Sequence, residues 1–320
     1  MSEKKTTYLD AISQAVREEM LRDEAVFLIG EDEYEGEFRR NALEEFGSER
    51  VINIPMPEAA IIGSAVGVAL MGMRPIAEMR FVNFITCGFS QLIDMAAGMH
   101  WRFGNQLPIV VRGISDGSRL PVKQDAVSFQ MSGIKIVVPS TTYDAKGMLK
   151  AAVRDDNPVL YLEQKLLYRM PELREELPLD DYIVPLGKAI IRREGEDMTI
   201  LTYGAMVHQC LRAAQVLEED DDLEVEVLDL RSLSPLDRNA IIESVKRTNK
   251  VLIVHEDILA EGVGVELSAL VAEDLFEYLD GPIAQVATSS LSFPDTSSVK
   301  SPYMPNAEKI LSAARVLAAY

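Results

Sequence analysis

Short apolar runs alternate with longer stretches of helical periodicity along almost the whole chain. The apolar runs are rich in Val, Ile and Leu and cover residues 26–29, 76–79, 109–112, 134–138, 159–162, 199–202, 225–229, 251–255 and 283–287. Amphipathic stretches stand between many of them, at residues 143–153, 206–217, 237–248 and 262–276. Because continuous apolar strands are typical of sheets buried on both faces, the pattern predicts an α/β protein with mainly parallel sheets flanked by helices.

One segment interrupts this rhythm. Residues 170–184 are rich in Glu, Asp, Pro and Leu, a composition typical of a connection between domains. We therefore place a boundary near residue 185 and predict two domains, residues 1–185 and residues 186–320. The length of 320 residues agrees with this division, because a domain usually has about 100–200 residues.

The longest uncharged stretch, residues 59–73, contains Gly63, Gly67 and Gly72. It is shorter than the roughly 20 apolar residues that a membrane-spanning helix needs. We interpret it as an internal helix whose glycines let another backbone approach closely. Residues 1–7 are polar, so we expect neither a secretory signal nor attachment to a membrane.

Charge and rare residues narrow the functional classes. The chain has 51 acidic and 32 basic side chains, a net charge of −19 that disfavours binding to nucleic acids or to anionic lipids. Its two cysteines, Cys87 and Cys210, form no metal-binding or disulfide pattern, so we expect a cytoplasmic protein. No zinc motif, serine-nucleophile motif or phosphate-binding glycine loop occurs. We infer that part of the active site lies on another subunit.

A lone carboxylate, Glu58, stands directly after Pro57 and before the uncharged stretch. Proline at the first position and an acid in the first turn are ordinary features of a helix start, so one interpretation gives Glu58 no chemistry. In the other interpretation, the apolar surroundings desolvate the carboxylate and it exchanges protons with a ligand. The neighbouring residues leave both interpretations open.

Seven segments, in one order along the chain, resemble a known family. They are Gly-Glu-Asp at 30–32, Pro-Met-Pro-Glu-Ala-Ala at 55–60, Met-Arg-Pro-Ile-Ala-Glu at 73–78, Val-Val-Pro-Ser-Thr-Thr-Tyr-Asp at 137–144, Ile-Leu-Thr-Tyr-Gly-Ala-Met at 200–206, Leu-Asp-Leu-Arg-Ser-Leu-Ser-Pro at 228–235 and Val-His-Glu at 254–256. Together they resemble the β subunit of thiamine-diphosphate-dependent 2-oxo acid dehydrogenases, the transketolase-like pyruvate, branched-chain 2-oxo acid and acetoin dehydrogenase group. The resemblance implies a pyrimidine-binding domain followed by a transketolase C-terminal-like domain.

The resemblance also implies a site shared between subunits. In this family an α₂β₂ heterotetramer holds thiamine diphosphate between α and β, and the α subunit binds the diphosphate through Mg²⁺. Glu58 matches the glutamate that exchanges a proton with the cofactor's ring nitrogen. The main chain of Met56 would face the amino group, the ring of Phe84 would lie against the pyrimidine, and Glu31 would sit nearby. For Phe84, a purely structural role is equally open.

Many family members carry a potassium ion on a turn of backbone carbonyls. Residues 152–158 match that turn, which implicates Ala152, Asp155 and Asn157, with Ile109 opposite. Hard oxygen ligands suit such an ion. The alternative is that Asp-Asp-Asn-Pro forms a stable turn that needs no ion.

One departure concerns the loop at residues 114–126. The family usually has a histidine there that acts on the reacting intermediate, whereas this chain has Leu120, with Arg119 and Lys123 as candidate cationic replacements. The leading expectation is oxidative decarboxylation of pyruvate or a branched-chain 2-oxo acid, with acyl transfer to a lipoyl domain of an acyltransferase core. The alternatives are acetoin cleavage or carboligation without a lipoyl acceptor, and a non-catalytic paralogue that acts as a structural partner subunit.

Overall fold

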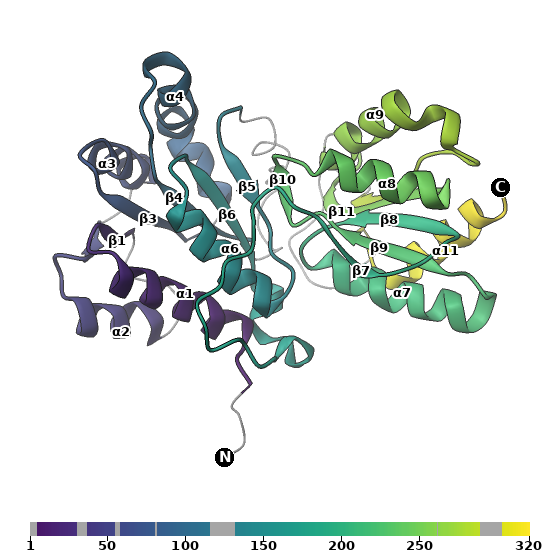
Figure 1. Ribbon diagram of the computed structural model, residues 1–320, viewed down its shortest axis with the longest axis horizontal. Helices are drawn as coiled ribbons and strands as arrows, with labels where there is room; N and C mark the ends of the chain where they lie inside the picture. Colours follow the sequence, from purple (N-terminus) through teal and green to yellow (C-terminus); the bar gives the residue numbers. More distant parts are fainter. Residues whose placement is uncertain are drawn as a thin grey trace. The chain divides into compact units, whose positions relative to one another are not determined.

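The computed structural model describes residues 5–30, 37–54, 58–80, 82–115, 132–260, 262–288 and 303–320. The described residues divide into two compact units, the first ending at Leu186 and the second beginning at Gly187 (Figure 1). Both units are parallel or mainly parallel sheets flanked by helices, as the apolar pattern predicted. No helix in the described ranges is long and apolar enough to cross a membrane.

The first unit is a parallel sheet with the strand order β5-β6-β4-β3-β1-β2. Its strands are β1 (Val26–Gly30), β2 (Val51–Asn53), β3 (Arg74–Met79), β4 (Val110–Ser115), β5 (Lys135–Val137) and β6 (Val159–Gln164). Its helices are α1 (Tyr8–Arg22), α2 (Glu37–Phe46), α3 (Glu58–Leu70), α4 (Gly98–Phe103) and α6 (Thr142–Arg154), with 3₁₀ helices η1 (Val82–Gly88), η3 (Lys165–Arg169) and η4 (Pro171–Leu173) and the π-helix η2 (Gln91–Ala97).

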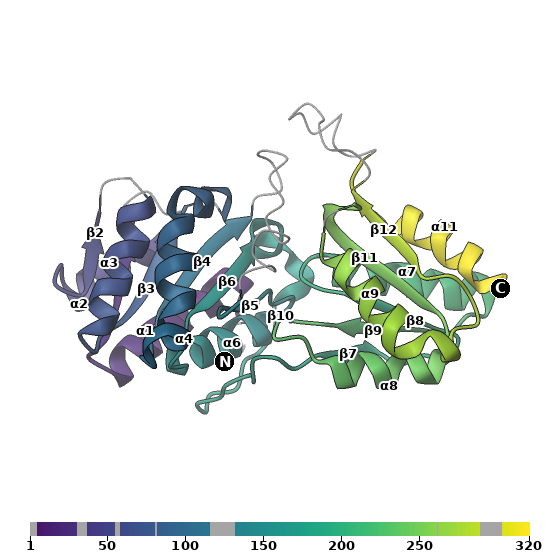
Figure 2. The same ribbon diagram turned by 90° about the horizontal axis from the view of Figure 1, so that it is seen from above.

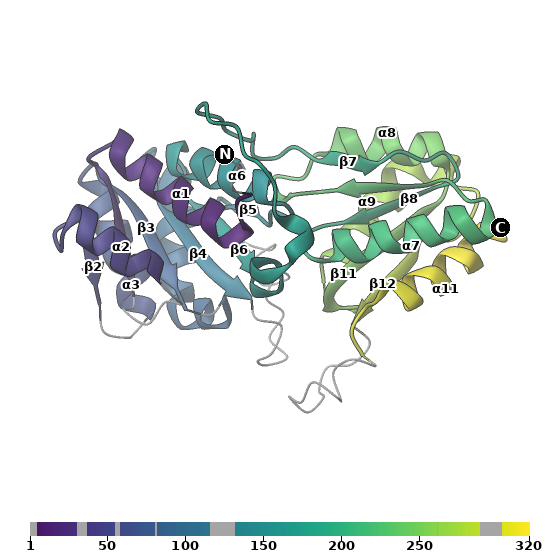
Figure 3. The ribbon, with the colours of Figure 1, turned by 90° about the horizontal axis from the view of Figure 1, so that it is seen from below.

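Helices cover both faces of this sheet. The helices α1, α2 and α6 lie on one side of the strands, and α3 and α4 lie on the other (Figures 1 and 3). Strand β1 is buried at every position, because it lies between β2 and β3 and under both helical layers. The helix expected at residues 59–73 instead ends at Leu70. The chain turns at Met71 and Gly72, and Gly72 adopts a positive φ of 92°, which favours glycine.

The second unit has the strand order β12-β11-β8-β9-β7. Its elements are β7 (Ile190–Arg193), β8 (Met198–Thr202), α7 (Met206–Asp221), β9 (Val225–Asp229), β10 (Ser232–Ser234), α8 (Arg238–Thr248), β11 (Val251–Ile258), α9 (Val263–Leu275), η5 (Phe276–Tyr278), β12 (Ala284–Thr288) and α11 (Ala307–Ala318). All its pairings are parallel except that between β7 and β9. The helices α7 and α11 lie on one face of the sheet, and α8 and α9 lie on the other (Figures 1 and 2).

Candidate functional site

The strand order places a ligand site in the first unit. From β1 the chain runs to β2 on one side and then crosses back to β3 on the other side of β1. In an open parallel sheet, ligands bind outside the carboxyl ends of the strands where the order reverses in this way. Gly30 ends β1 and pairs with Glu78 near the end of β3. The site is therefore expected beside these two residues.

Glu58 lies at the start of α3, the helix that follows β2 and leads to β3. Its side chain is only 9% exposed. Within the described part of the chain, its carboxylate has no hydrogen bond and no ion pair. The helix N-terminus favours a negative charge there. The carboxylate oxygens are not among the fully enclosed polar atoms that lack a hydrogen bond in the described part of the chain, so they remain open to a donor from a bound ligand.

Phe84 lies on η1, which follows β3 and packs against α3. At Gly88 the two elements lie close together, because an added Cβ atom would lie 2.6 Å from Cδ1 of Ile62 and 3.4 Å from the carbonyl oxygen of Glu58. Phe84 itself is half-buried. The structure therefore brings the elements of Glu58 and Phe84 together at the carboxyl edge of the sheet.

Other expected residues fall outside the described ranges. Glu31 and Met56 are among them, as are Leu120, Arg119 and Lys123 of the altered loop. The described residues that come directly before these two segments are Gly30 and Ile54. The backbone N–H of Ile54 donates to the carbonyl oxygen of Gly30 at 2.9 Å. The residues that directly precede the segments with Glu31 and Met56 are therefore hydrogen-bonded to each other.

Sequence reasoning missed a buried chain of charges at the same edge. Arg39 on α2 pairs with Glu78, whose other oxygen accepts a hydrogen bond from Arg112 at 2.6 Å. Arg112 also holds Glu163, with distances of 2.6 and 3.1 Å. Each of these side chains is at most 4% exposed. The signal in the sequence was that Glu78 stands inside an apolar run and that Arg112 and Glu163 stand at or just beyond the end of one.

The four residues of the potassium expectation gather around the turn after α6. Asp155 Oδ1 accepts a hydrogen bond from the N–H of Asn157 at 2.9 Å, and its carboxylate pairs with Lys135. The carbonyl oxygen of Ala152 accepts from the N–H of Asp155 at 3.3 Å. The carbonyl oxygen of Ile109 accepts from the N–H of Val159 at 2.9 Å.

A second cation reaches this turn. Arg74 donates to the carbonyl oxygens of Val153 and Asp155 at 3.1 Å each. Among the described residues, no group of three or more His, Cys, Asp or Glu side chains could hold a metal ion. A potassium ion at this turn would therefore rest on carbonyl oxygens.

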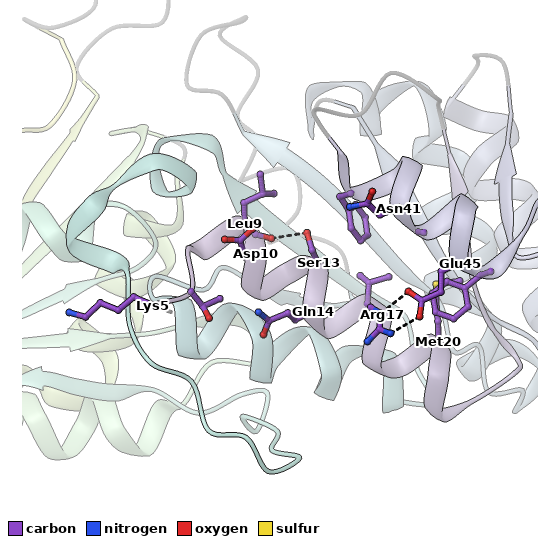
Figure 4. A pocket seen from close by; sticks show the side chains of 14 residues that line it. Lys5, Leu9, Asp10, Ser13, Gln14, Arg17, Met20, Asn41 and Glu45 are labelled. Carbon is purple, nitrogen blue, oxygen red and sulfur yellow. Dashed lines mark hydrogen bonds and ion pairs between the residues drawn. The ribbon is translucent and has the colours of Figure 1, made fainter. Parts of the chain in front are cut away.

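A groove of about 610 Å³ lies between α1 and α2 (Figure 4). Leu9, Met20, Phe38 and Phe46 contribute apolar walls. The guanidinium of Arg17 donates two hydrogen bonds of 2.6 Å to the carboxylate of Glu45 across it. Of the expected site residues that the structure describes, none lines this groove.

In the second unit, His255 ends the apolar part of β11 and is 1% exposed. Burial lowers its pKa to about 4, so the imidazole is neutral at pH 7. An added Cβ atom at Gly262 would lie 2.7 Å from its Cε1 atom, so the start of α9 closes tightly over the ring. His255 is therefore tightly packed, and neither of its ring nitrogens has a hydrogen-bond partner among the described residues.

Comparisons with known proteins agree with this arrangement. The family model described as "Transketolase, pyrimidine binding domain" matches residues 4–171. The family model described as "Transketolase, C-terminal domain" matches residues 187–310. The chain is 43% identical over 326 residues to the 2-oxoisovalerate dehydrogenase subunit beta of Bacillus subtilis, covering 98% of this chain and 99% of that protein. It is 38% identical over 320 residues to the pyruvate dehydrogenase E1 component subunit beta of the same organism, covering 97% of each. A solved structure titled as a split gene transketolase, inactive beta4 tetramer, is similar in fold, with a TM-score of 0.83, 20% identity and 98% of each chain covered.

Proposed function

Because the chain belongs to the family of β subunits of thiamine-diphosphate-dependent 2-oxo acid dehydrogenases, we propose that it supplies the pyrimidine-binding half of an active site shared with an α subunit. Residues 1–185 would form the cofactor-binding domain and residues 186–320 the second domain. The single observation that carries this proposal is the buried carboxylate of Glu58, which has no partner among the described residues.

Glu58 fits the cofactor through that unpaired carboxylate. It would accept and return a proton at the pyrimidine ring nitrogen, and its burial would strengthen this hydrogen bond. The ring of Phe84 would pack against the pyrimidine, and Glu31 and the main chain of Met56 would orient it. Bound thiamine diphosphate supplies the carbanion stabilisation that decarboxylation of a 2-oxo acid requires, while the protein orients it and excludes water.

The substrate would be pyruvate or a branched-chain 2-oxo acid, and the acyl group would pass to a lipoyl domain of an acyltransferase core in the cytoplasm. One observation favours a second candidate. Leu120 stands where the family's loop histidine is expected, and without a proton donor there the transfer to a dithiolane lacks an acid catalyst. Cleavage of acetoin or carboligation, with no lipoyl acceptor, would avoid that step.

The proposed partner is an α subunit in an α₂β₂ heterotetramer, which would hold the Mg²⁺ and the diphosphate. An apolar surface supports it. The elements α3, η2 and α4 contact one another and expose Met95, Trp101 and Phe103 at 46%, 80% and 68%, with Met71 at 84% just after α3. We call these four side chains the apolar surface. Large exposed apolar side chains on neighbouring elements are typical of a docking site for another protein.

We also propose a potassium ion on the carbonyls around Ala152 and Ile109, beside Asp155 and Asn157. Each carbonyl oxygen has a second lone pair beyond the hydrogen bond that it already accepts. The thermal midpoint should then be higher in potassium chloride than in tetramethylammonium chloride at equal concentration. Equal midpoints would show that Arg74 and Lys135 satisfy the turn without an ion.

Co-expression with an α subunit tests the proposed function. The purified complex should reduce an artificial electron acceptor with pyruvate, branched-chain 2-oxo acids or acetoin, and only when thiamine diphosphate and Mg²⁺ are present. A parallel assay of lipoyl-domain acylation separates the two candidates, because only the first requires it. A complex that forms but binds no thiamine diphosphate would refute the proposal and favour a non-catalytic subunit.

A further inference from the structure

Arg39 makes an unusual set of contacts for a helix residue next to a sheet edge. It lies on α2 and is 4% exposed. Its Nε and Nη2 atoms donate to Oδ1 of Asn53 at 2.9 and 2.7 Å, and Nη2 also donates to the carbonyl oxygen of Ile52 at 2.8 Å. The same Nη2 atom reaches the carbonyl oxygen of Gly30 at 3.5 Å, and Nη1 pairs with Glu78.

All the uncharged acceptors belong to the carboxyl ends of two strands. Gly30 is the last residue of β1 and directly precedes Glu31. Ile52 and Asn53 end β2, and the chain continues from them toward Met56 and Glu58. The guanidinium of Arg39 therefore connects the end of β1 to the end of β2. These two strand ends precede the segments that we propose face the cofactor. A guanidinium suits this task because its donors form a rigid fork.

Glu78 holds the guanidinium of Arg39 in place. Its side chain is fully buried, and its second oxygen is held by Arg112, which is itself held by Glu163. The carboxylate of Glu163 also accepts a hydrogen bond of 2.6 Å from the hydroxyl of Tyr168. The positive charges of Arg39 and Arg112 thus offset the negative charges of Glu78 and Glu163. Buried ion pairs are weak evidence for stability, because apolar side chains of similar volume often stabilise a fold equally well.

We propose that Arg39 is a positioning residue: it fixes the ends of β1 and β2 and thereby sets the geometry of Glu31, Met56 and Glu58 toward the cofactor. The inference rests on the proposed function. Arg39 does not touch the reacting atoms and acts only through the strand ends. The competing explanation is that Arg39 merely fastens α2 to the sheet and that its loss would lower stability without affecting cofactor binding.

Arg50 provides a matched control for that explanation. It lies in the same unit and also ties strand β1 to its surroundings, but at the amino end. Its Nη2 atom donates to the carbonyl oxygens of Met20 and Asp23 at 2.9 and 3.0 Å, and its Nε atom to that of Val26 at 3.2 Å. Both arginines therefore lose several hydrogen bonds to neighbouring backbone or side-chain oxygens when replaced, and only Arg39 is next to the proposed site.

The test uses the complex with the α subunit and compares wild type with Arg39→Lys, Arg39→Met and Arg50→Met. Calorimetry measures the dissociation constant of thiamine diphosphate in the presence of Mg²⁺. We expect both Arg39 variants to raise it by about 10-fold or more, the effect of losing one or two charge-assisted hydrogen bonds. Arg50→Met should change it less than about 2-fold while lowering the thermal midpoint.

Two further readouts separate positioning from stability. At saturating cofactor, both Arg39 variants should still turn over more slowly than wild type, because Glu58 stays misplaced, whereas Arg50→Met should turn over like wild type. In the complex without cofactor, hydrogen exchange should rise in peptides that cover residues 28–36 and 50–57 and stay unchanged in peptides from residues 198–230. Arg39→Lys retains the charge opposite Glu78, so its thermal midpoint should stay closer to wild type than that of Arg39→Met.

Equal dissociation constants for the Arg39 variants, Arg50→Met and wild type would overturn the inference. If neither Arg39 variant folds, Asn53→Ala tests the inference instead. It removes the side-chain oxygen that accepts two hydrogen bonds from Arg39, and it leaves Arg39 in place. It should weaken cofactor binding, and an unchanged dissociation constant would refute the inference. Failure of the wild-type complex to bind thiamine diphosphate would refute the proposed function instead, so the two failures are distinguishable.

Discussion

Glu58 illustrates what a single side chain can and cannot establish. An acid in the first turn of a helix is ordinary, and such residues normally point into water. Glu58 is instead 9% exposed and has no partner among the described residues, although α3 offers it an apolar environment. Its oxygens are not fully enclosed, so a donor from a bound ligand could reach them. Low exposure is compatible with both interpretations, and the Glu58→Gln variant decides between them.

Gly30 is a second residue whose identity follows from the site. A Cβ atom at this position would lie 2.7 Å from the carbonyl oxygen of Glu78 and 2.9 Å from its Cβ atom. We expect Gly30→Ala to lower the free energy of unfolding by about 1–3 kcal/mol, because the β1 and β3 backbones would have to move apart. Urea denaturation of the isolated chain measures this change.

The control for Gly30 is Gly67→Ala on α3. Apart from the backbone of α3 itself, no atom of the described residues lies within 4 Å of a Cβ atom built at Gly67, and alanine is the better helix former by about 1 kcal/mol. Gly67→Ala should therefore be neutral or stabilising in the same experiment. Equal losses in both variants would contradict the close approach of β1 to β3.

His255 makes a prediction about pH. Burial lowers its pKa to about 4 from the ordinary 6.5, so between pH 6.5 and pH 4 the unfolded chain takes up a proton that the folded chain does not. The stability that neutral His255 contributes is complete above pH 6.5 and falls by about 3 kcal/mol as the pH drops to 4. His255→Asn should flatten this part of the profile of thermal midpoint against pH. A parallel decline in variant and wild type would show that other groups cause it.

At the scale of elements, the apolar pattern located the central strands because they are buried on both faces. It missed β2 and β7, which are short and only partly buried, so their sequences carry no continuous apolar run. The apolar runs that predicted β4 and β6 also end at residues 112 and 162, before the strands themselves end. Both strands continue past Arg112 and Glu163, whose charges are neutralised inside the sheet by partners that lie far away in sequence. Such pairing is a tertiary property that no local window reveals.

The contact between α1 and α6 depends on a buried acid. Glu19 is fully buried on α1 and accepts hydrogen bonds from Arg154 on α6 at 2.6 and 3.1 Å and from Arg22 at 2.7 Å. We expect Glu19→Ala to destabilise the protein by about 2 kcal/mol, less than a fully buried pair because both arginines are partly exposed. Denaturation of the isolated chain tests this.

The neighbouring pair between α1 and α2 serves as the comparison. Arg17 and Glu45 are 55% and 34% exposed. Breaking that pair with Glu45→Ala should change stability by less than about 0.5–1 kcal/mol, because solvent screens it. If Glu45→Ala is as harmful as Glu19→Ala, burial is not what distinguishes the two contacts.

At the scale of the whole molecule, composition and pattern predicted two α/β units, and the missing phosphate loop predicted a partner. The sequence could not show which surface meets the partner, because exposure depends on the packing of α3, η2 and α4 against one another. Glu58 and Phe84 were accessible through the family resemblance, whereas Arg39 carries no motif and emerges only from its contacts.

Assembly should depend on that surface. Trp101 is 80% exposed on α4, so Trp101→Glu should leave the thermal midpoint of the isolated chain nearly unchanged and yet prevent formation of the complex with the α subunit. A charge buried at an interface without a partner is strongly unfavourable. Sedimentation velocity of the mixed subunits measures assembly. Leu179→Glu, at a fully exposed position in the connecting segment, is the control and should assemble normally.

The central claim is that Glu58 exchanges a proton with a cofactor bound between two subunits. Glu58→Gln tests it most directly, because the amide is nearly isosteric and cannot perform that exchange. In the complex with the α subunit, the variant should fold and assemble like wild type, and its turnover at saturating thiamine diphosphate should fall by roughly 100-fold or more. Turnover close to that of wild type would contradict the account.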